Sequence, residues 1–272
     1  MDTHFNNKII VITGASSGIG KALASLALSQ GAKVALCARN MEKLMLAFPE
    51  DQFEDLLLFQ ADVSQLEDCR AFVDAVLSKW GGIDILINNA GMSMRAMFAE
   101  LDLNILKELM EVNFWGTVYM TKLALPSIKK SKGTIAGVSS IAGYRGLPAR
   151  TGYSSSKFAM HGFLESLRTE MRNEGVNVMW VAPGFTSSNI RNTALAADGK
   201  TQKETPLKED KLMSAEQCAA IIMTGIAKRK RTIVMTLQGK ATVFLNKLFP
   251  GFMDKMVFDH FAKEAGSPLK KS

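Results

Sequence analysis

The chain has 272 residues, 47% of them hydrophobic, and a formal net charge of +7 at pH 7. This length is near the upper limit for one hydrophobic core, and no linker, internal repeat or low-complexity segment divides it. Apolar runs shorter than eighteen residues exclude a membrane-spanning helix, and the polar residues 1–7 lead us to expect no signal peptide. Cys37, Cys69 and Cys218 lack metal or redox spacing, so we expect no metal and a cytoplasmic location.

The first predicted element is a buried strand at residues 8–13, an apolar run typical of parallel sheets. It leads into a glycine-rich turn at residues 14–20 and then into a helical pattern. Strand, turn and helix N-terminus together form an anion cradle, because glycines allow close backbone approach and free N–H groups face the ligand. We therefore predict that the turn binds the pyrophosphate of a dinucleotide. The predicted contacts are Gly14, Ser16, Ser17, Gly18, Ile19 and Gly20.

The same turn also satisfies Gly-x-Ser-x-Gly, the nucleophile elbow of α/β-hydrolases. Such a hydrolase needs an acid and then a histidine later in the chain to activate the serine. His4 precedes the turn, His161 falls in the helical pattern that carries Lys157, and His260 lies in the C-terminal tail. The hydrolase alternative also leaves the later polar motifs without a role, so we prefer the nucleotide site.

The second predicted strand, Lys33–Ala38, bears on the choice of cofactor. NAD enzymes of this kind place an acid at the end of this strand to bind the ribose hydroxyls. Here that position is Ala38, and Arg39 follows it. A guanidinium binds a phosphate dianion through paired hydrogen bonds, which favours NADP(H), with Ser16 and Ser17 as further contacts. The alternative is an Arg39 that only lies along the surface.

Four further apolar runs alternate with helical patterns. The runs cover residues 56–59, 83–88, 134–139 and 176–182, and two long helical patterns cover residues 101–129 and 154–173. This alternation predicts a single-domain α/β fold, a doubly wound Rossmann-type parallel sheet with helices on both faces. Ligands bind at the carboxyl ends of such strands, where the polar motifs fall.

Tyr153 and Lys157 lie four residues apart, and Ser140 lies thirteen residues before Tyr153. Positions i and i+4 share one helix face, so the Lys157 ammonium can reach the Tyr153 oxygen. A nearby positive charge lowers a phenol pKa that starts at about 10. The pattern predicts a tyrosine that transfers protons near neutral pH, with the Ser140 hydroxyl binding the substrate oxygen.

As a set, these motifs resemble the classical short-chain dehydrogenase/reductase family over about residues 5–237. The matching residues are Thr13 with the turn 14–20, Asn88-Asn89-Ala90-Gly91, Asn113, Ser139-Ser140, Tyr153, Lys157 and Pro183-Gly184. The resemblance implies an enzyme that transfers a hydride between a nicotinamide cofactor and a carbonyl or secondary alcohol, and Arg39 makes NADP(H) the expected cofactor. It also implies a homo-oligomer, a dimer or tetramer, assembled through the two long helices.

The resemblance implies four catalytic residues. Tyr153 is the acid/base, Lys157 lowers its pKa and holds the nicotinamide ribose, Ser140 binds the substrate oxygen, and Asn113 holds a proton-relaying water. For Asn113, a helix-interior amide bonded to backbone is the alternative. Ser139 is expected only to end its strand. Further implied cofactor contacts are Asp62 at the adenine, Val63, Asn89, Ala90, Gly91, Pro183, Gly184 and Thr186.

Three features of the sequence bear on the substrate. Residues 185–213 occupy the place of the family's substrate lid, and long polar loops of this kind are often functional. Its lysines suggest an anionic substrate or, more simply, a solvated face. Methionines after Gly91 and a tyrosine after Ser140 slightly favour an apolar pocket over plain core packing. The lysines are Lys200, Lys203, Lys208 and Lys211. The methionines are Met92, Met94 and Met97, and the tyrosine is Tyr144.

The segment from residue 228 onward carries ten Lys or Arg and three acids, which is the entire surplus charge. Its apolar residues recur at i, i+1, i+4 and i+5 and predict one stripe on a helix. Residues 1–237 are thus expected to form the catalytic domain and residues 238–272 a basic amphipathic extension.

A basic amphipathic helix indicates peripheral contact with an anionic inner membrane surface, and packing on the body or a second subunit is the alternative. Similar extensions occur in family members that reduce steroid or lipid ketones at membranes, so the resemblance implies a lipophilic ketone or aldehyde. No basic and aromatic groove for nucleic acid is present in the sequence. A non-catalytic NADP-binding sensor or scaffold is the main rival, and the presence of all four catalytic residues argues for the enzyme.

Overall fold

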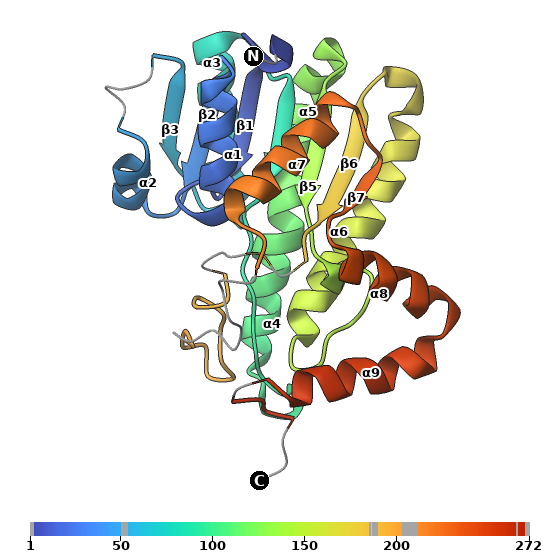
Figure 1. The fold of residues 1–272 in the computed structure, drawn as a ribbon. Helices are drawn as coiled ribbons and strands as arrows, with labels where there is room; N and C mark the ends of the chain where they lie inside the picture. Colours follow the sequence, from blue (N-terminus) through green and yellow to red (C-terminus); the bar gives the residue numbers. More distant parts are fainter. Residues whose placement is uncertain are drawn as a thin grey trace.

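Parallel β-strands form the centre of the computed structural model, which describes residues 3–49, 54–184, 186, 190–202, 212–264 and 266–269. Seven strands of this described part lie in one sheet in the order β3-β2-β1-β4-β5-β6-β7, as Figure 1 shows. Their bounds are β1 Ile9–Thr13, β2 Lys33–Ala38, β3 Leu56–Gln60, β4 Ile85–Asn88, β5 Thr134–Val138, β6 Asn177–Ala182 and β7 Thr232–Val234. The predicted α/β fold with a doubly wound parallel sheet is confirmed.

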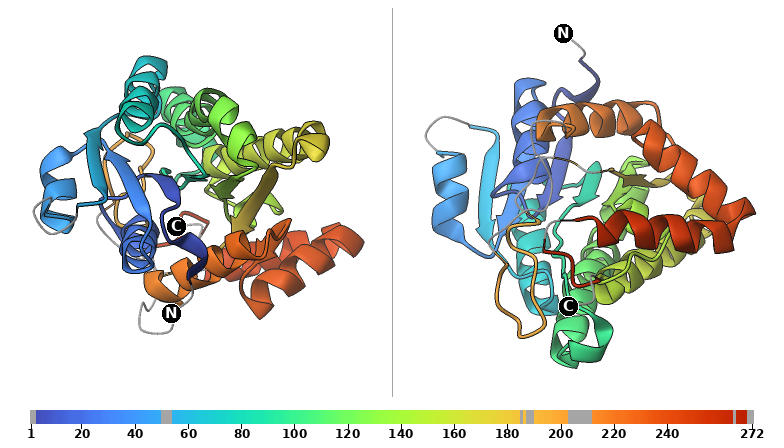
Figure 2. Two further views of the ribbon diagram at one scale, coloured as in Figure 1. Left: turned by 90° about the horizontal axis from the view of Figure 1, so that it is seen from above. Right: turned by 60° about the horizontal axis from the view of Figure 1, so that its bottom comes forward.

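Helices cover both faces of this sheet (Figure 2). Successive strand residues point to opposite faces, so Val11 and Leu86 join the core under α3, α5 and α6, whereas Ile10 and Ile12 join the core under α1 and α7. The helix bounds are α1 Gly18–Ser29, α2 Met41–Ala47, α3 Leu66–Trp80, α4 Leu103–Met110, α5 Gly116–Ser131, α6 Thr151–Glu170, α7 Ala215–Ala227, α8 Leu237–Leu248 and α9 Pro250–Ala262. None of the helices in the described ranges is long and apolar enough to span a bilayer.

Two elements differ from the sequence prediction. The helical pattern at 101–129 is not one helix, because a π-helical turn, Glu111–Trp115, separates α4 from α5. Such turns are rare and frequent at functional sites, and this one carries Asn113. The short strand β7 was not predicted, since its three half-buried residues follow a basic run and give too short a pattern.

The predicted lid is described only in part. Arg95 N–H donates to the Leu195 carbonyl at 2.8 Å, which ties residues 190–202 to the segment after β4. Lys200 forms an exposed ion pair with Asp198 at 3.0 Å, which agrees with a solvated face. The other three lysines of the lid prediction, Lys203, Lys208 and Lys211, lie outside the described residues.

The predicted stripe of the tail is divided in the structure. Met253, Val257 and Phe261 of α9 are buried and pack with Leu147 of the body. The neighbouring apolar side chains remain exposed on α8, α9 and the turn between them. These are Phe244, Leu248, Phe249, Phe252, Met256 and Phe258. Packing on the body therefore accounts for one edge of the stripe only.

A buried polar cluster lies behind the carboxyl end of β5. His161, one turn after Lys157 on α6, has its Nε2 2.7 Å from Ser139 Oγ. The imidazole lies between the rings of Tyr144 and Trp180, and Trp180 Nε1 donates to Tyr144 Oη at 2.8 Å. Ser139 thus does more than end its strand, and Tyr144 belongs to this cluster and not to an apolar substrate pocket.

This cluster generates a pH prediction. Burial, with help from the charge of Lys157, lowers the pKa of His161 from 6.5 to about 4. The unfolded chain therefore binds a proton more readily than the folded one between these values, so the contribution of His161 to stability is present above pH 6.5 and lost as pH falls towards 4. The loss reaches about 1.4 kcal/mol per pH unit within this window.

We expect the free energy of urea unfolding to fall more from about pH 7 to pH 5 in the wild type than in His161→Gln. The exposed His4 offers a matched control, and His4→Gln should behave as the wild type. Equal falls in the wild type and His161→Gln would contradict this account of the cluster.

Candidate active site

A cavity of about 530 Å³ follows the carboxyl ends of the central strands. It is the position at which doubly wound sheets bind their ligands. Every cofactor contact proposed from the sequence lines it, and so does Ser140. The lining residues from that set are Gly14, Ser16, Ser17, Gly18, Ile19, Gly20, Arg39, Asp62, Val63, Asn89, Ala90, Gly91, Tyr153, Lys157, Pro183, Gly184 and Thr186.

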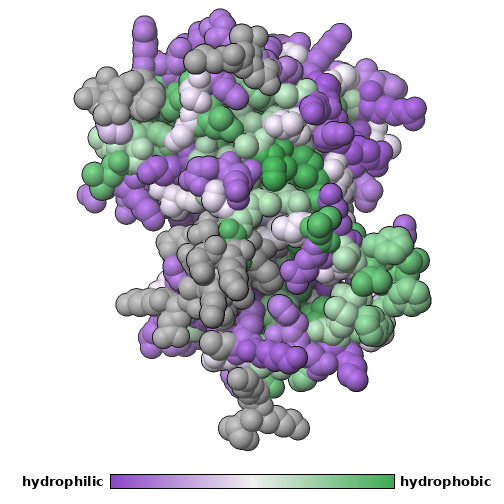
Figure 3. Space-filling view, in the orientation of Figure 1, coloured by the Kyte–Doolittle hydropathy of each residue, from purple (hydrophilic) through white to green (hydrophobic). Residues whose placement is uncertain are grey.

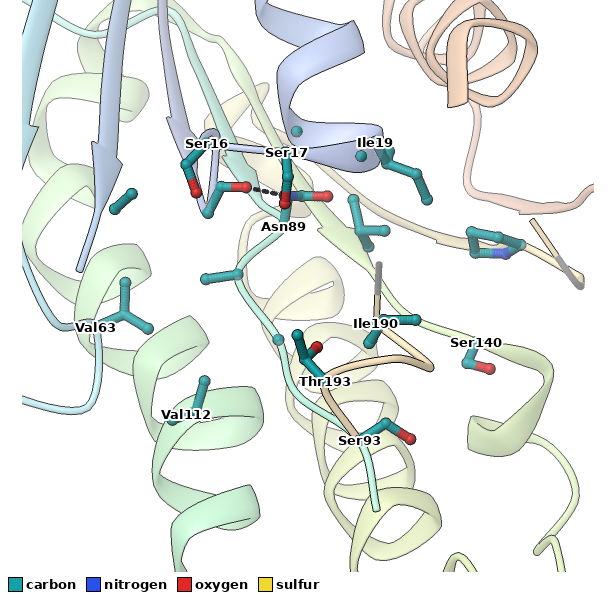
Figure 4. Close-up of a pocket in the computed structure, with 18 of the residues that line it drawn as sticks. Ser16, Ser17, Ile19, Val63, Asn89, Ser93, Val112, Ser140, Ile190 and Thr193 are labelled. Atoms are coloured by element: carbon teal, nitrogen blue, oxygen red, sulfur yellow. Dashed lines mark hydrogen bonds between the residues drawn. The ribbon is translucent and has the colours of Figure 1, made fainter. Parts of the chain in front are cut away.

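Hydrogen bonds join the ends of β1 and β4 at the floor of this cavity. Thr13 Oγ1 accepts from the N–H groups of Asn89 and Ala90, both at 3.0 Å. The Asn89 side-chain amide donates to the carbonyls of Thr13 and Gly14 at 2.9 and 3.1 Å, and Figure 4 shows Asn89 directed at the glycine turn. Gly14 has φ +67°, and a Cβ there would lie 2.7 Å from Ala90 Cα. Only glycine fits this close approach.

The N-terminus of α1 faces the same cavity. Its N-cap residue Ser17 makes no side-chain capping bond, and no acidic residue stands in the first turn. The first N–H groups of the helix therefore remain available to an anion, and the helix dipole favours negative charge there. Residues present at this end of the cavity fit the pyrophosphate of a dinucleotide.

Two basic residues also line this cavity. Arg39 and Lys43 both line the cavity next to Ala38, while Asn40 Oδ1 caps α2 by accepting from Lys43 N–H at 2.7 Å. Lys43 was missed in the sequence, although its i+4 spacing from Arg39 at a helix start was a usable signal. One carboxylate oxygen of Asp62, Oδ1, accepts hydrogen bonds from the N–H and the hydroxyl of Ser64.

Ser140 follows β5, and Tyr153 and Lys157 lie on the first turns of α6. Burial raises the pKa of Tyr153, while a hydrogen bond with Ser140 and the positive charge of Arg150 lower it. Lys157 is almost fully buried, and burial lowers its pKa to about 8. Its ammonium donates to the Val138 carbonyl at 3.0 Å and lies 5.8 Å from the centroid of the Tyr153 ring. The role expected for Lys157 stays a prediction, and Arg150 is the cation that acts on Tyr153 here.

Asn113 stands behind the cavity wall. Its Oδ1 accepts from Met92 N–H at 2.8 Å, and its amide donates to the Met92 carbonyl and to Ser156 Oγ at 3.0 and 2.9 Å. The amide is thus bonded to backbone, as in the alternative interpretation, but across to another segment. A Cβ on Gly91 would lie 3.2 Å from Asn113 Oδ1 and 3.5 Å from Lys157 Nζ, so these groups converge. The relay water stays a prediction.

The substrate end of the cavity contains residues that the sequence did not indicate. Leu147 and Arg150 line it from the segment that joins Ser140 to α6. Ser93, Ile190 and Thr193, labelled in Figure 4, line the same cavity as Ser140 and come from segments with no motif of their own. Two of the methionines proposed for an apolar pocket are instead core residues, namely Met92 and Met94.

Comparison with known proteins agrees with this site. The model of the short chain dehydrogenase family matches residues 8–199. A "Dehydrogenase/reductase SDR family protein 7-like" from Dictyostelium discoideum is 34% identical over 279 residues, which cover 99% of this chain and 85% of that protein. The "11-beta-hydroxysteroid dehydrogenase-like 4A" of Arabidopsis thaliana is also 34% identical, over 90% of this chain and 82% of its own length.

A solved short chain dehydrogenase/reductase from Burkholderia phymatum, in complex with NAD, has the same fold. Its TM-score is 0.81 with 24% identity, and the match covers 92% of this chain and 96% of that one. Sheet order, glycine cradle and the convergence of Ser140, Tyr153 and Lys157 agree with the family match. The chain therefore belongs to the short-chain dehydrogenase family of oxidoreductases.

Proposed function

We propose that the protein is an NADP(H)-dependent oxidoreductase acting on the CH–OH group of a secondary alcohol or on a lipophilic ketone or aldehyde. The observation that carries this proposal is one cavity in which Ser140, Tyr153 and Lys157 meet a glycine cradle. The nicotinamide, when bound, supplies or accepts the hydride. The site fits a small molecule, and a cytoplasmic location accords with the three buried free thiols.

In this proposal the side chains orient the substrate and move one proton. The Ser140 hydroxyl holds the substrate oxygen, and the Tyr153 hydroxyl donates its proton to that oxygen as a carbonyl is reduced. Because burial raises the pKa of Tyr153, the phenol is protonated near neutral pH and ready to donate. Reduction should therefore be fastest below this pKa and be lost as pH rises through it.

Replacement of the proton donor tests this chemistry. Tyr153→Phe should lower the turnover of NADPH with a reactive ketone at least about 100-fold, because general acid catalysis is removed. NADPH affinity, measured by fluorescence titration, should change little. Tyr144→Phe removes a phenol outside the cavity and should keep most activity. Near-normal turnover by Tyr153→Phe would contradict the mechanism. If the wild-type protein binds NADPH tightly but reduces no carbonyl compound, the sensor or scaffold alternative would be favoured.

The preference for NADP(H) rests on the cavity beyond β2. Ala38 leaves the usual acid position without a carboxylate, and Arg39 and Lys43 place two cations beside it. A phosphate dianion on the ribose would gain charge-assisted hydrogen bonds from this pair. The related Burkholderia phymatum structure contains NAD, so the preference depends on these residues and not on the fold.

We expect wild-type Km for NADPH to be lower than for NADH, and Arg39→Asp to raise the Km for NADPH about 10- to 100-fold. Steady-state rates with both cofactors measure this ratio. Arg70→Asp makes the same charge change on the half-exposed surface of α3 and should leave the ratio unchanged. An unchanged NADPH/NADH ratio in Arg39→Asp would refute the assignment.

The lipophilic substrate class rests on the exposed face of α8 and α9. Phe244 is 63% exposed and Phe252 58% exposed, and Figure 3 shows apolar surface over the tip of this helix pair. Four lysines lie on the same two helices or directly after α9, and they would attract anionic lipids. They are Lys240, Lys247, Lys255 and Lys263. We propose peripheral contact of this face with an anionic membrane, where a lipophilic carbonyl such as the steroid in a relative's name would be found.

Vesicle co-sedimentation tests this contact. Wild-type protein should bind vesicles that contain phosphatidylserine and not neutral phosphatidylcholine vesicles, and Phe249→Ser/Phe252→Ser should lose most of this binding. Phe98→Ser removes an equally exposed phenylalanine elsewhere and should bind normally. Equal loss in Phe98→Ser, or no binding by the wild type, would argue against a membrane face.

We also propose that the protein forms a homo-oligomer. Trp115, at the end of the π-helical turn before α5, and Phe158 on α6 expose large apolar side chains in the two helical segments expected to assemble. Such side chains are typical of the centre of protein interfaces. A dimer or tetramer would cover them.

A further inference from the structure

A carboxylate from the tail lies between two arginines beside the active site. Glu264 Oε2 is 3.2 Å from an Arg150 guanidinium nitrogen and 3.4 Å from one of Arg95. The Glu264 side chain is 5% exposed, and each arginine side chain is 11% exposed. Ions so deeply buried lose much of their hydration, and only close pairing offsets the free-energy cost of that loss.

Arg150 connects this ion cluster to the site. It is the N-cap residue of α6, three positions before Tyr153, and its side chain lines the cavity with Leu147. Its charge acts on Tyr153, and burial lowers the pKa of Arg150 itself while Glu264 raises it. A cation therefore stands at the substrate end of the cavity, and Glu264 is its acidic partner among the described residues.

Contacts of the tail help to position Glu264. Phe261, one of the buried anchors of α9, places its ring 4.6 Å from the Arg150 guanidinium carbon. Glu264 N–H donates to the Phe261 carbonyl at 3.3 Å, and Ser267 Oγ donates to the same carbonyl at 2.7 Å. The carboxylate is thus delivered to Arg150 by a segment outside the dinucleotide-binding fold.

This arrangement has a consequence for selectivity. An arginine at the substrate end of the cavity would bind a substrate carboxylate through paired, charge-assisted hydrogen bonds. Arg150 Nη2 already donates to Glu264 Oε2 at 3.2 Å, and Nη1 donates to the Pro148 carbonyl at 3.5 Å. The negative charge of Glu264 would also repel a second carboxylate nearby. A neutral carbonyl compound does not need the arginine hydrogen bonds and is not repelled by the charge of Glu264.

We infer that Glu264 is a specificity-determining residue, which occupies Arg150 so that the site accepts neutral lipophilic carbonyl compounds and discriminates against those bearing a carboxylate. The inference rests on the proposed function for what the cavity binds. It makes the C-terminal tail part of the substrate site, although the tail contributes no group to the proton transfer.

A charge-matched pair of probes tests it, 4-formylbenzoate and its neutral methyl ester. For the full-length protein with NADPH, the anion-to-ester ratio of kcat/KM should rise about tenfold or more in Glu264→Gln, which keeps the shape and removes the charge. Calorimetry in the presence of NADP+ should give the same shift in the ratio of dissociation constants. Adding Arg150→Gln to this variant should abolish the rise.

Two controls separate charge from loss of structure. Asp254→Asn removes another tail carboxylate, paired with Arg145 of the same active-site segment, and should leave the ratio unchanged. Arg150→Gln alone should lower the ratio, because Glu264 then repels an anion without its cation. If the substitutions only undocked the tail, the anion-to-ester ratio would shift in the same direction in Glu264→Gln and in Arg150→Gln.

An unchanged ratio in Glu264→Gln, an equal rise in Asp254→Asn, or shifts of the same sign in both single variants would overturn the inference. If the wild type reduces neither probe, the proposed function fails for this substrate class, while the dissociation constants still decide the role of Glu264. Absence of binding by both probes in every variant would also overturn it.

Discussion

The hydrogen-bonded junction between the ends of β1 and β4 is the constraint on which the site depends. Thr13 and Asn89 exchange side-chain and backbone bonds across it, and they bring Gly14 so close to Ala90 that no Cβ fits between them. Gly91 follows at once, and a Cβ there would lie only 3.2 Å from Asn113 Oδ1 and 3.5 Å from Lys157 Nζ, so the same junction places the anion cradle close to the proton-transferring groups. One local approach of two backbones thus places a dinucleotide and a tyrosine on the same cavity.

Burial has the largest effect on the pKa values of the groups in this cavity. Burial raises the pKa of Tyr153 and lowers that of Lys157, so each group is held towards its neutral form. Arg150 is the nearby cation that opposes this effect on Tyr153, and Glu264 of the tail compensates that cation in turn. The catalytic helix and the C-terminal segment are therefore linked by charge, in addition to the apolar packing of Met253, Val257 and Phe261 against Leu147.

The sequence was informative wherever local chemistry dictates local structure. Buried β-branched runs and the glycine turn predicted six of the strands and the cradle, since periodicity and positive φ are local properties. The rest depends on contacts between distant residues. Glu264 reads as one acid in a basic tail, Arg150 as an ordinary loop arginine, and only the fold brings them together. Likewise, nothing near Asn113 in the sequence reveals the π-helical turn that aims its amide at Met92.

The most direct test of the central claim is the fate of the hydrogen on C4 of the cofactor. NADPH carrying deuterium at the transferred C4 position should yield an alcohol with one deuterium on the former carbonyl carbon, detected by mass spectrometry and NMR. Unlabelled product from labelled cofactor, or label lost to water, would contradict a hydride-transfer site built from Ser140, Tyr153 and the glycine cradle.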